Sequence, residues 1–330
     1  MMSEVGHALR AAVLVAMLTG MLAVLNPVPA AAHIIGTGGS PSNYRATVTA
    51  IHPAAPAVGV TIGLGGQWVR ITNQGAAEIV ILGYDGERFL RLSNNHVQAN
   101  ELSGTAVVTG LTRGPAAPGD PAPRWVTVTD GDNATWSDTR ISQQAPGSWE
   151  LPLVVDGQRV TVAGTREEIA PSSPWPWLVV LALLTAGVVA LGRRRDWHRP
   201  MAAVVAVGML AFVTHVLGTG FAPQENGRVI GWVGVGAIGA FSLAIGLVTA
   251  IAVARRSTAA PDRLVICGAM VLLLAATDIN VLWYSQVPFA GPAVLDRALT
   301  VLIYASALGM FLAGLRQVRA VRAAQPHQGG

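Results

Sequence analysis

The sequence predicts an integral membrane protein in which an extracytoplasmic β-sandwich of the immunoglobulin-like kind precedes an α-helical bundle of five transmembrane helices. Composition is the first observation: 52% of the 330 residues are hydrophobic and 12% are charged. With a mean hydropathy of +0.47, the chain is too apolar for an ordinary soluble protein, so much of it must face lipid. The second observation is a series of short alternating segments over residues 33–173, and the third is five long apolar segments after residue 174.

Residues 1–32 have the three parts of a secretory signal peptide. Arg10 precedes an apolar run over residues 11–25, and Ala30 and Ala32 then fit a small-residue cleavage site. Cleavage after Ala32 would make His33 the first residue of the mature chain, and cleavage after Ala30 is the nearest alternative. An uncleaved signal anchor is less favoured, because the apolar run is shorter than the about 20 residues that a membrane span needs.

Residues 33–173 are rich in Gly, Pro, Thr, Asn and Val, and their short alternating runs are typical of strands. Turn signals at residues 73–75, 84–87 and 156–157 separate several of these runs. Roughly eight short strands in about 140 residues favour a β-sandwich of the immunoglobulin-like sort. We expect strands over residues 44–51, 58–64, 67–72, 78–82, 88–92, 124–129, 134–141, 149–155 and 159–165.

The C-terminal part, residues 174–317, is predicted to cross the membrane five times. A Pro-rich linker ends in Trp175 and Trp177, which favour the membrane interface. Short Arg-rich segments at residues 193–199, 255–263 and 316–322 alternate with loops of less positive charge, so the positive-inside rule places the Arg-rich segments and the tail, residues 318–330, in the cytoplasm. The protein is thus expected in the cell membrane with its β domain outside. The predicted spans are about 177–192, 200–217, 230–253, 264–283 and 298–315.

Basic residues and cysteine narrow the function classes further. All 22 basic residues are arginine, a bias typical of a high-GC bacterial genome, and most lie in short runs beside apolar segments. They are therefore interpreted as topology determinants and not as a nucleic-acid surface. The single cysteine, Cys267, falls inside a predicted span, so the β domain must be held by its core and not by a disulfide.

Histidines supply the candidate sites. A free N-terminal amine and the imidazole of His33 can together chelate Cu(II), which favours nitrogen-rich square-planar sites, whereas cleavage that merely happens to fall at this residue is the alternative. In the bundle, His215 and Asp278 are costly in lipid and lie at similar predicted depth, so they can pair, or bind a cation together with Asn280. A structural hydrogen bond between helices is the favoured interpretation of that pair.

Catalytic signatures are not found. Neither a Ser-His-Asp arrangement, a zinc motif nor a phosphate-binding motif is recognisable, so no catalytic residue is predicted and the chain is expected not to be an enzyme. A membrane-bound enzyme is the third hypothesis, since only Asp85, Glu87 and Asp138 form a polar group and the sequence shows nothing that pairs them.

Several of these segments resemble a family of uncharacterised actinobacterial membrane proteins, with an exported β domain and a C-terminal helical bundle. The resemblance is carried by residues 83–91, by Trp125 and Trp136, and by residues 149–157 leading to 174–177. In many members the tryptophan matching Trp136 is followed by a histidine-rich run, of which only Asp138 and Arg140 are present here. If that run binds metal in relatives, the resemblance implies that this chain has lost the ligands. Architecture alone is also similar to fusions of the copper-resistance proteins CopC and CopD.

The function expected from these features is a non-enzymatic membrane protein whose exported domain binds or senses an envelope ligand or protein partner. The bundle then serves as an anchor in the lipid bilayer or as a partner-binding module. The alternative is a copper-handling or copper-transporting protein that uses His33 and the pair of His215 and Asp278. No cofactor is expected unless copper is bound.

Overall fold

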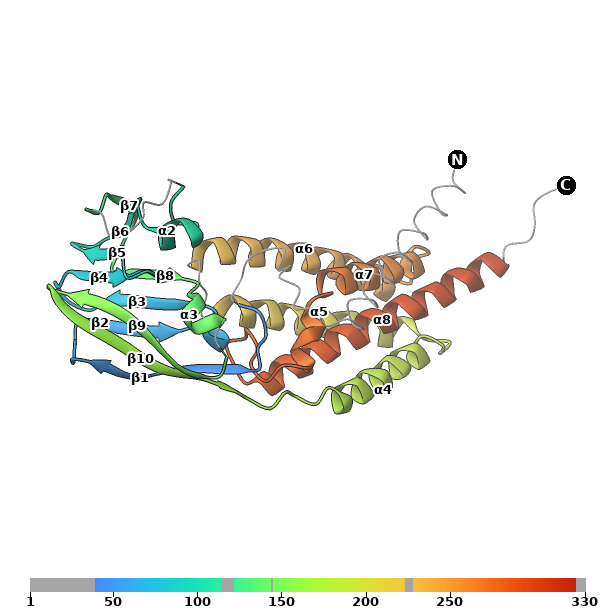
Figure 1. Cartoon of the computed structure of the whole chain (residues 1–330). Coiled ribbons are helices and arrows are strands. Elements are labelled where there is room, and N and C mark those ends of the chain that lie inside the picture. The colour runs from blue at the N-terminus through green and yellow to red at the C-terminus, as the bar shows by residue number, and fades with distance from the viewer. Residues whose placement is uncertain (1–38, 114–121, 144, 223–227, 325–330) are drawn as a thin grey trace. The chain divides into compact units, whose positions relative to one another are not determined.

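The computed structural model describes residues 39–113, 122–143, 145–222 and 228–324. The predicted signal peptide and His33 lie outside the described residues. The chain forms two compact units, one over residues 39–170 and one over residues 171–222 and 228–324, and each is described by itself. The first is built of strands and the second of helices (Figure 1).

The β domain consists of two antiparallel sheets. Seven strands pair in the order β1-β10-β9-β4-β5-β6-β7, and three pair in the order β2-β3-β8. This partition of seven and three strands is not the four-and-three division of an immunoglobulin constant-type domain. The strands are β1 (Tyr44–His52), β2 (Val58–Ile62), β3 (Val69–Asn73), β4 (Ile79–Leu82), β5 (Arg88–Ser93), β6 (His96–Asn100), β7 (Trp125–Asp130), β8 (Asn133–Trp136), β9 (Gly147–Val155) and β10 (Gln158–Glu168).

One hydrophobic core joins the two sheets. Alternate residues of β9, such as Leu151 and Leu153, are fully buried and belong to the same hydrophobic cluster as Ile71 of β3. Phe89 of the larger sheet and Trp136 of the smaller one pack edge to face, with ring centroids 5.7 Å apart. The alternation predicted from the sequence is therefore the alternation that fills this core.

Two segments of the β domain differ from the sequence expectation. The strand expected over residues 134–141 ends at Trp136, because Asp138 caps a short helix, α3 (Thr139–Ser142), by accepting a 2.9 Å hydrogen bond from the backbone N–H of Arg140. The strand β6 was not expected. It begins at His96, directly after a two-residue turn in which Asn94 and Asn95 have φ of 50° and 61°.

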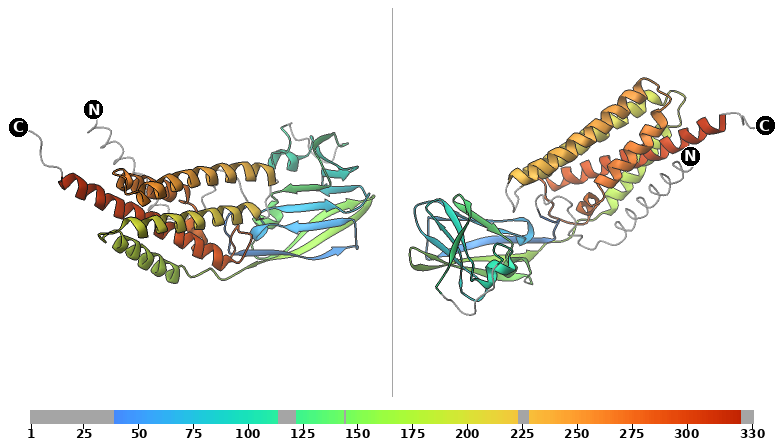
Figure 2. Two further views of the ribbon diagram at one scale, coloured as in Figure 1. Left: turned by 180° about the vertical axis from the view of Figure 1, so that it is seen from behind. Right: turned by 90° about the horizontal axis from the view of Figure 1, so that it is seen from above.

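The helical unit contains α4 (Trp175–Leu191), α5 (His198–Phe221), α6 (Arg228–Ala254), α7 (Ala260–Leu274), the short 3₁₀ helix η2 (Asp278–Leu282) and α8 (Ala293–Ala324). Helix α8 packs against α4, α5 and α7, and the views in Figure 2 show these helices running side by side. Among the described residues, α5, α6 and α8 are long and apolar enough to cross a membrane. Helix α4 is apolar but has 17 residues, or about 26 Å at 1.5 Å per residue.

The segment expected to form one span over residues 264–283 is broken. Helix α7 ends at Leu274, and η2 follows after a short turn. At the α7–α8 interface a Cβ on Gly268 would lie 2.5 Å from the carbonyl oxygen of Ala307, so only glycine allows the two helices to approach this closely. Before the break α7 and α8 are thus in close contact, and after it the segment of η2 is buried in a second apolar cluster with Val301 of α8.

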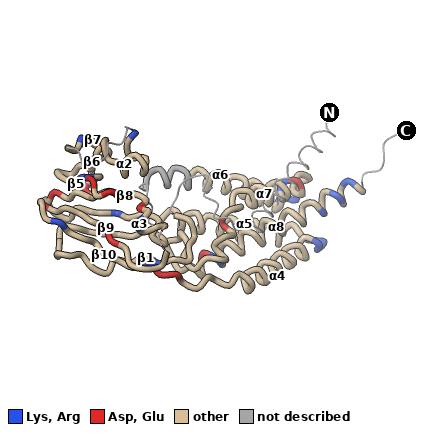
Figure 3. Tube along the Cα trace, in the orientation of Figure 1, with Lys and Arg blue, Asp and Glu red and all other residues tan. Residues whose placement is uncertain are grey.

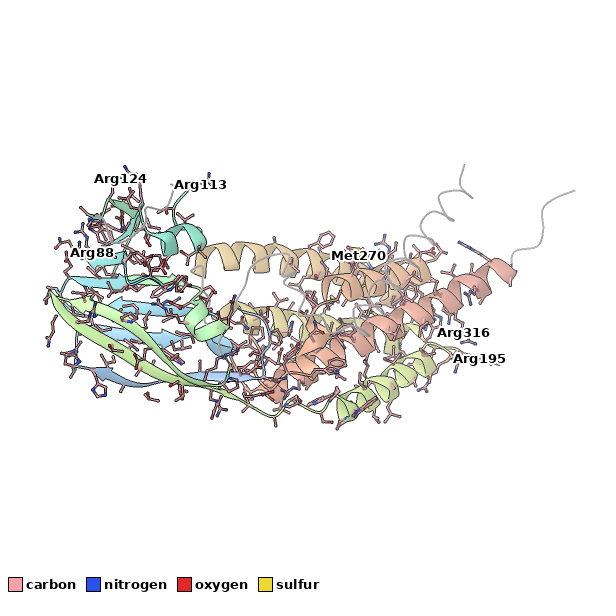
Figure 4. All side chains as sticks on the ribbon, viewed as in Figure 1. Arg88, Arg113, Arg124, Arg195, Met270 and Arg316 are labelled. Carbon is pink, nitrogen blue, oxygen red and sulfur yellow. The ribbon has the colours of Figure 1, made fainter. Side chains whose placement is uncertain are left out.

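Arginines gather at one end of the helical unit, where α4 ends, α7 begins and α8 ends (Figure 3). Arg195 and Arg316 lie at this end (Figure 4). The break after α7 and the start of α8 lie at the opposite end of the bundle. The short connections at the arginine-rich end thus carry more positive charge than the loops at the opposite end, as the sequence pattern indicates.

Candidate functional sites

His215 is the centre of a buried polar cluster in the bundle. Its Nδ1 lies 2.8 Å from Oδ1 of Asp296, and its Nε2 lies 3.3 Å from Oδ2 of Asp278. The side chains of His215 and Asp296 are 7% and 1% exposed, while that of Asp278 is 25% exposed. The structure therefore brings together the two residues singled out in the sequence and adds a second carboxylate on the other face of the ring.

The break in the fourth apolar segment positions Asp278. Because α7 stops at Leu274, its last carbonyls lack partners within the helix, and the Tyr304 hydroxyl donates a hydrogen bond to the carbonyl of Ala275. The 3₁₀ turn that follows begins with Asp278. A side chain of α8 thus provides a hydrogen-bond donor for the irregular backbone after α7.

Arg297 holds the other end of the irregular segment. Its Nε donates to the carbonyl of Val281 at 3.1 Å, and its Nη2 donates to the carbonyl of Tyr284 at 2.6 Å. Both residues follow Asp278 in the chain, so α8 fixes the turn from two sides. Asp296, its neighbour in α8, points to His215 instead.

Hydrogen-bond chemistry limits the proton count of the cluster. A neutral imidazole donates from one ring nitrogen only, and an ionised carboxylate only accepts. A carboxylate lies beside each ring nitrogen, so both contacts are hydrogen bonds in two cases. Either His215 carries a proton on each nitrogen, or one of the two aspartates is protonated and donates to the ring nitrogen that has no proton. The hydrogen bonds of the cluster therefore depend on how many protons its three side chains hold.

Asp296 was missed by the sequence reasoning because the last span was expected to begin at residue 298, which left this residue in a loop. The structure begins α8 at Ala293, so that Asp296 stands in its first turn. Asn280, considered as a further ligand, makes no described side-chain contact with His215. The signal that could have found Asp296 is a carboxylate just before an apolar run, a common position in the first helical turn.

In the β domain, two of the three acidic residues considered for an enzyme, Glu87 and Asp138, have their carboxylates in internal hydrogen bonds, whereas the Asp85 side chain is exposed. Asp138 is fully buried and accepts hydrogen bonds from Nε1 of Trp136 at 3.0 Å and from Nη2 of Arg140 at 2.7 Å. The same guanidinium donates to the carbonyls of Leu82 and Gly83 and lies over the Tyr84 ring. Through the Arg140 guanidinium, the segment of Trp136, Asp138 and Arg140 therefore fixes the turn that follows β4.

Glu87 completes that turn. Its carboxylate accepts hydrogen bonds from the Ser103 hydroxyl at 2.7 Å and from the Thr105 backbone N–H at 3.0 Å. Burial raises the pKa of Glu87, but the hydrogen bonds from Thr105 and Ser103 outweigh it and leave the pKa below the ordinary value of 4.5. Asp85 and Glu87 meet through the Asp85 backbone N–H, 3.1 Å from Glu87 Oε2. Two motifs that carried the family resemblance thus fold into one structural network.

A groove of about 500 Å³ opens between three turns of the β domain, and we call it the amide groove. It is lined by residues 73–76 and 92–95, at the ends of β3 and β5 and in the turns after them, and by residues 131–132 after β7. Gly131 donates its backbone N–H to the carbonyl of Asn95 at 2.8 Å, and Asn73 donates to the carbonyl of Asp132 at 2.7 Å. The three turns are thereby tied into one preformed surface.

The amide groove lies at the end of the domain away from the chain's exit to the helical unit. Glu78, beside the groove, exchanges hydrogen bonds with the turn at Asp156, where β10 begins. From there β10 runs 11 residues, about 36 Å at 3.3 Å per residue, to Glu168. The chain leaves the domain directly afterwards, at Ala170.

The remaining histidines of the β domain are on its surface. His52 is exposed at the end of β1, and His96 pairs with Asp130 at 2.8 Å. Within the described parts of the chain, no group of three or more His, Cys, Asp or Glu side chains is arranged to hold a metal ion. Copper binding at His33 stays a prediction that N-terminal sequencing of the mature protein, followed by Cu(II) titration, would test.

No protein-family model, curated protein or solved structure matches this chain.

Proposed function

We propose that this chain is a non-enzymatic binding protein of a bacterial cell envelope, anchored by five membrane crossings, whose exported β domain takes a neutral, hydroxyl-rich ligand in the amide groove. The groove itself carries this proposal. Its volume falls within the range of about 300–1,000 Å³ typical of small-ligand sites. The three turns that form it are already tied together by backbone hydrogen bonds, so a ligand would meet an ordered surface.

The chemistry of the lining supports a hydroxyl-rich ligand such as a glycan. Gln74, Asn94 and Asn95 are exposed, and their side-chain amides offer both donors and acceptors, which is what sugar hydroxyls require. Ala76 supplies a small exposed apolar surface beside them, while the side chain of Leu92 is buried in the core beneath the groove. The lining contains no basic residue and one acid, Asp132, so it suits neither an anionic ligand nor a strongly cationic one.

The membrane part of the proposal rests on charge and length. Three helices have the length to cross, and α4 and the broken segment of α7 and η2 are proposed to cross with them. The clustering of arginines at one end of the bundle supports that end as cytoplasmic, with the β domain outside. The bundle then anchors the exported domain.

Ligand binding is tested with the full-length protein in lipid nanodiscs, applied to an array of neutral and acidic oligosaccharides. The variant Gln74→Ala/Asn94→Gly/Asn95→Gly removes the amides, while glycine keeps the positive φ that the turn needs. Binding to neutral glycans should fall at least tenfold in this variant. It should be unchanged in the control Gln143→Ala, which removes an exposed amide outside the groove. Equal binding by both variants, or no glycan bound by the parent, would overturn the proposed ligand class.

Orientation is tested separately by cysteine labelling, since the native thiol of Cys267 is buried. An impermeant maleimide applied to intact cells should label Ser137→Cys in the β domain and should leave Ser257→Cys, on an Arg-rich connection, unlabelled. Both positions are exposed in the structure. The reverse pattern would contradict the proposed topology.

A further inference from the structure

The cluster around His215 continues into a line of polar side chains along one face of α8. Asp296, Thr300 and Tyr304 follow each other at intervals of four residues, the spacing that places side chains on one face of a helix. Within the cluster that leads to this line, side-chain exposure falls from 25% for Asp278 to 7% for His215 and 1% for Asp296. Thr300 is fully buried, and its hydroxyl has no hydrogen-bond partner among the described residues.

A purely structural hydrogen bond between helices would require fewer polar groups than this cluster contains. One aspartate on one ring nitrogen would join α5 to α8, and polar contacts between membrane helices are worth only about 0.6 kcal/mol on average. Here a second carboxylate is held at the other nitrogen by a helix break and by two side chains of α8, Tyr304 and Arg297. Ionisable side chains inside membrane segments are rare, and in pumps and transporters such acids and histidines form proton and ion pathways.

Few charged groups surround the cluster. On α8, Arg297 faces the carbonyls of Val281 and Tyr284, and Tyr304 donates to Ala275. Phe289, from the segment before α8, stacks on the imidazole with ring centroids 6.4 Å apart. Neither the described part of α6 nor α4 brings an ionisable side chain to the ring. The ionisable groups of the cluster are therefore the two aspartates and His215, with the Arg297 guanidinium interacting electrostatically with Asp296 and the Tyr304 hydroxyl with Asp278.

We propose that His215 is a proton relay, which carries protons between the partly exposed Asp278 and the buried Asp296. In the inward step, the Asp278 carboxyl breaks its O–H bond and His215 Nε2 forms an N–H bond. The Nδ1–H bond then breaks and its proton passes to Oδ1 of Asp296, 2.8 Å away. One proton enters and one leaves the ring, so the imidazole ends with the number that it had. This inference does not depend on the ligand of the amide groove.

The relay is tested by infrared spectroscopy of the full-length protein in nanodiscs after a rapid drop in pH. The carboxyl C=O band that disappears in Asp296→Asn identifies the buried acid. In His215→Gln, which keeps a hydrogen-bonding side chain but cannot accept and release a proton, this band should appear roughly 10²-fold more slowly, the lower end of what a positioned acid–base group contributes. Asp278→Asn should slow it as well. Asp196→Asn, at an exposed carboxylate in the connection between α4 and α5, is the matched control and should leave the rate unchanged.

A merely structural role predicts a different result. His215→Gln would then lower the thermal stability of the bundle while Asp296 gained its proton at the parent rate, and this outcome would overturn the relay. The absence of any band that Asp296→Asn removes would overturn it too. If gel filtration and circular dichroism show that His215→Gln does not fold, the protonation rate of Asp296 in Asp278→Asn decides alone. Asp278 is partly exposed, and replacing it leaves the contact between His215 and Asp296 intact.

Discussion

Replacing Arg140 with leucine tests whether the buried carboxylate of Asp138 depends on its guanidinium partner. Arg140 donates from Nε to Oδ1 at 3.0 Å and from Nη2 to Oδ2 at 2.7 Å, and from Nη1 to two carbonyls of the neighbouring turn at 3.2 Å. Asp138 is 0% exposed, so water cannot take the place of the lost donors.

The expected loss follows from these contacts. Removing one partner of a buried ion pair costs about 3–5 kcal/mol, because the other charge stays buried without compensation. Asp138 keeps its hydrogen bonds from the Trp136 indole and from the backbone N–H of residue 140, which favours the lower value of about 3 kcal/mol. With a urea dependence of about 2 kcal/mol per M, the unfolding midpoint of the β domain should fall by about 1.5 M.

The measurement is pulse proteolysis of the β domain in the full-length protein, held in nanodiscs and equilibrated in urea. Arg159→Leu is the matched control, since this arginine is exposed and should change stability by less than about 0.5 kcal/mol. The double variant Asp138→Leu/Arg140→Leu should recover part of the loss, because it removes both charges. A loss below about 1 kcal/mol for Arg140→Leu, the value of an exposed ion pair, would refute the reasoning.

Three further substitutions address other parts of the fold. Because the folded-state pKa of Glu87 lies below its ordinary value of 4.5, its contribution to stability is present above that pH and is lost as the pH falls through the folded pKa. Glu87→Gln should therefore flatten the loss of β-domain stability on acidification, and an unchanged acid unfolding curve would contradict this. At the β9–β10 turn, Gly157 has φ of 82°, so Gly157→Ala should lower the free energy of unfolding by about 1–2 kcal/mol in the same urea assay. Gly75→Ala is the control and should be nearly neutral, because φ is not positive there and a Cβ has room. In the bundle, Gly268→Ala should lower the thermal unfolding midpoint in detergent, because the added Cβ pushes α7 away from α8. Gly187→Ala is the control and should not lower it, because a Cβ there meets no atom within 4 Å. Equal effects of the two substitutions would argue against close packing as the cause.

The sequence by itself determined the order and kind of the parts. Alternation of apolar and polar residues has a period of two in strands that cover a core, so β9 and β10 were predicted close to their observed bounds. The length of the apolar runs predicted the helices α5, α6 and α8, since a membrane span must match the thickness of the hydrocarbon. Both signals are local and can be read from one stretch of chain.

Tertiary structure alone decided which polar groups meet. Asp138 and Arg140 are two residues apart, yet their role depends on a turn after β4 that lies more than 50 residues earlier. His215 and Asp278 were paired by depth, but the second carboxylate, Asp296, appears only once α8 begins earlier than expected and α7 ends early. Such contacts depend on where helices and strands stop, which is set by hydrogen bonds and packing between distant segments and not by the periodicity within one of them.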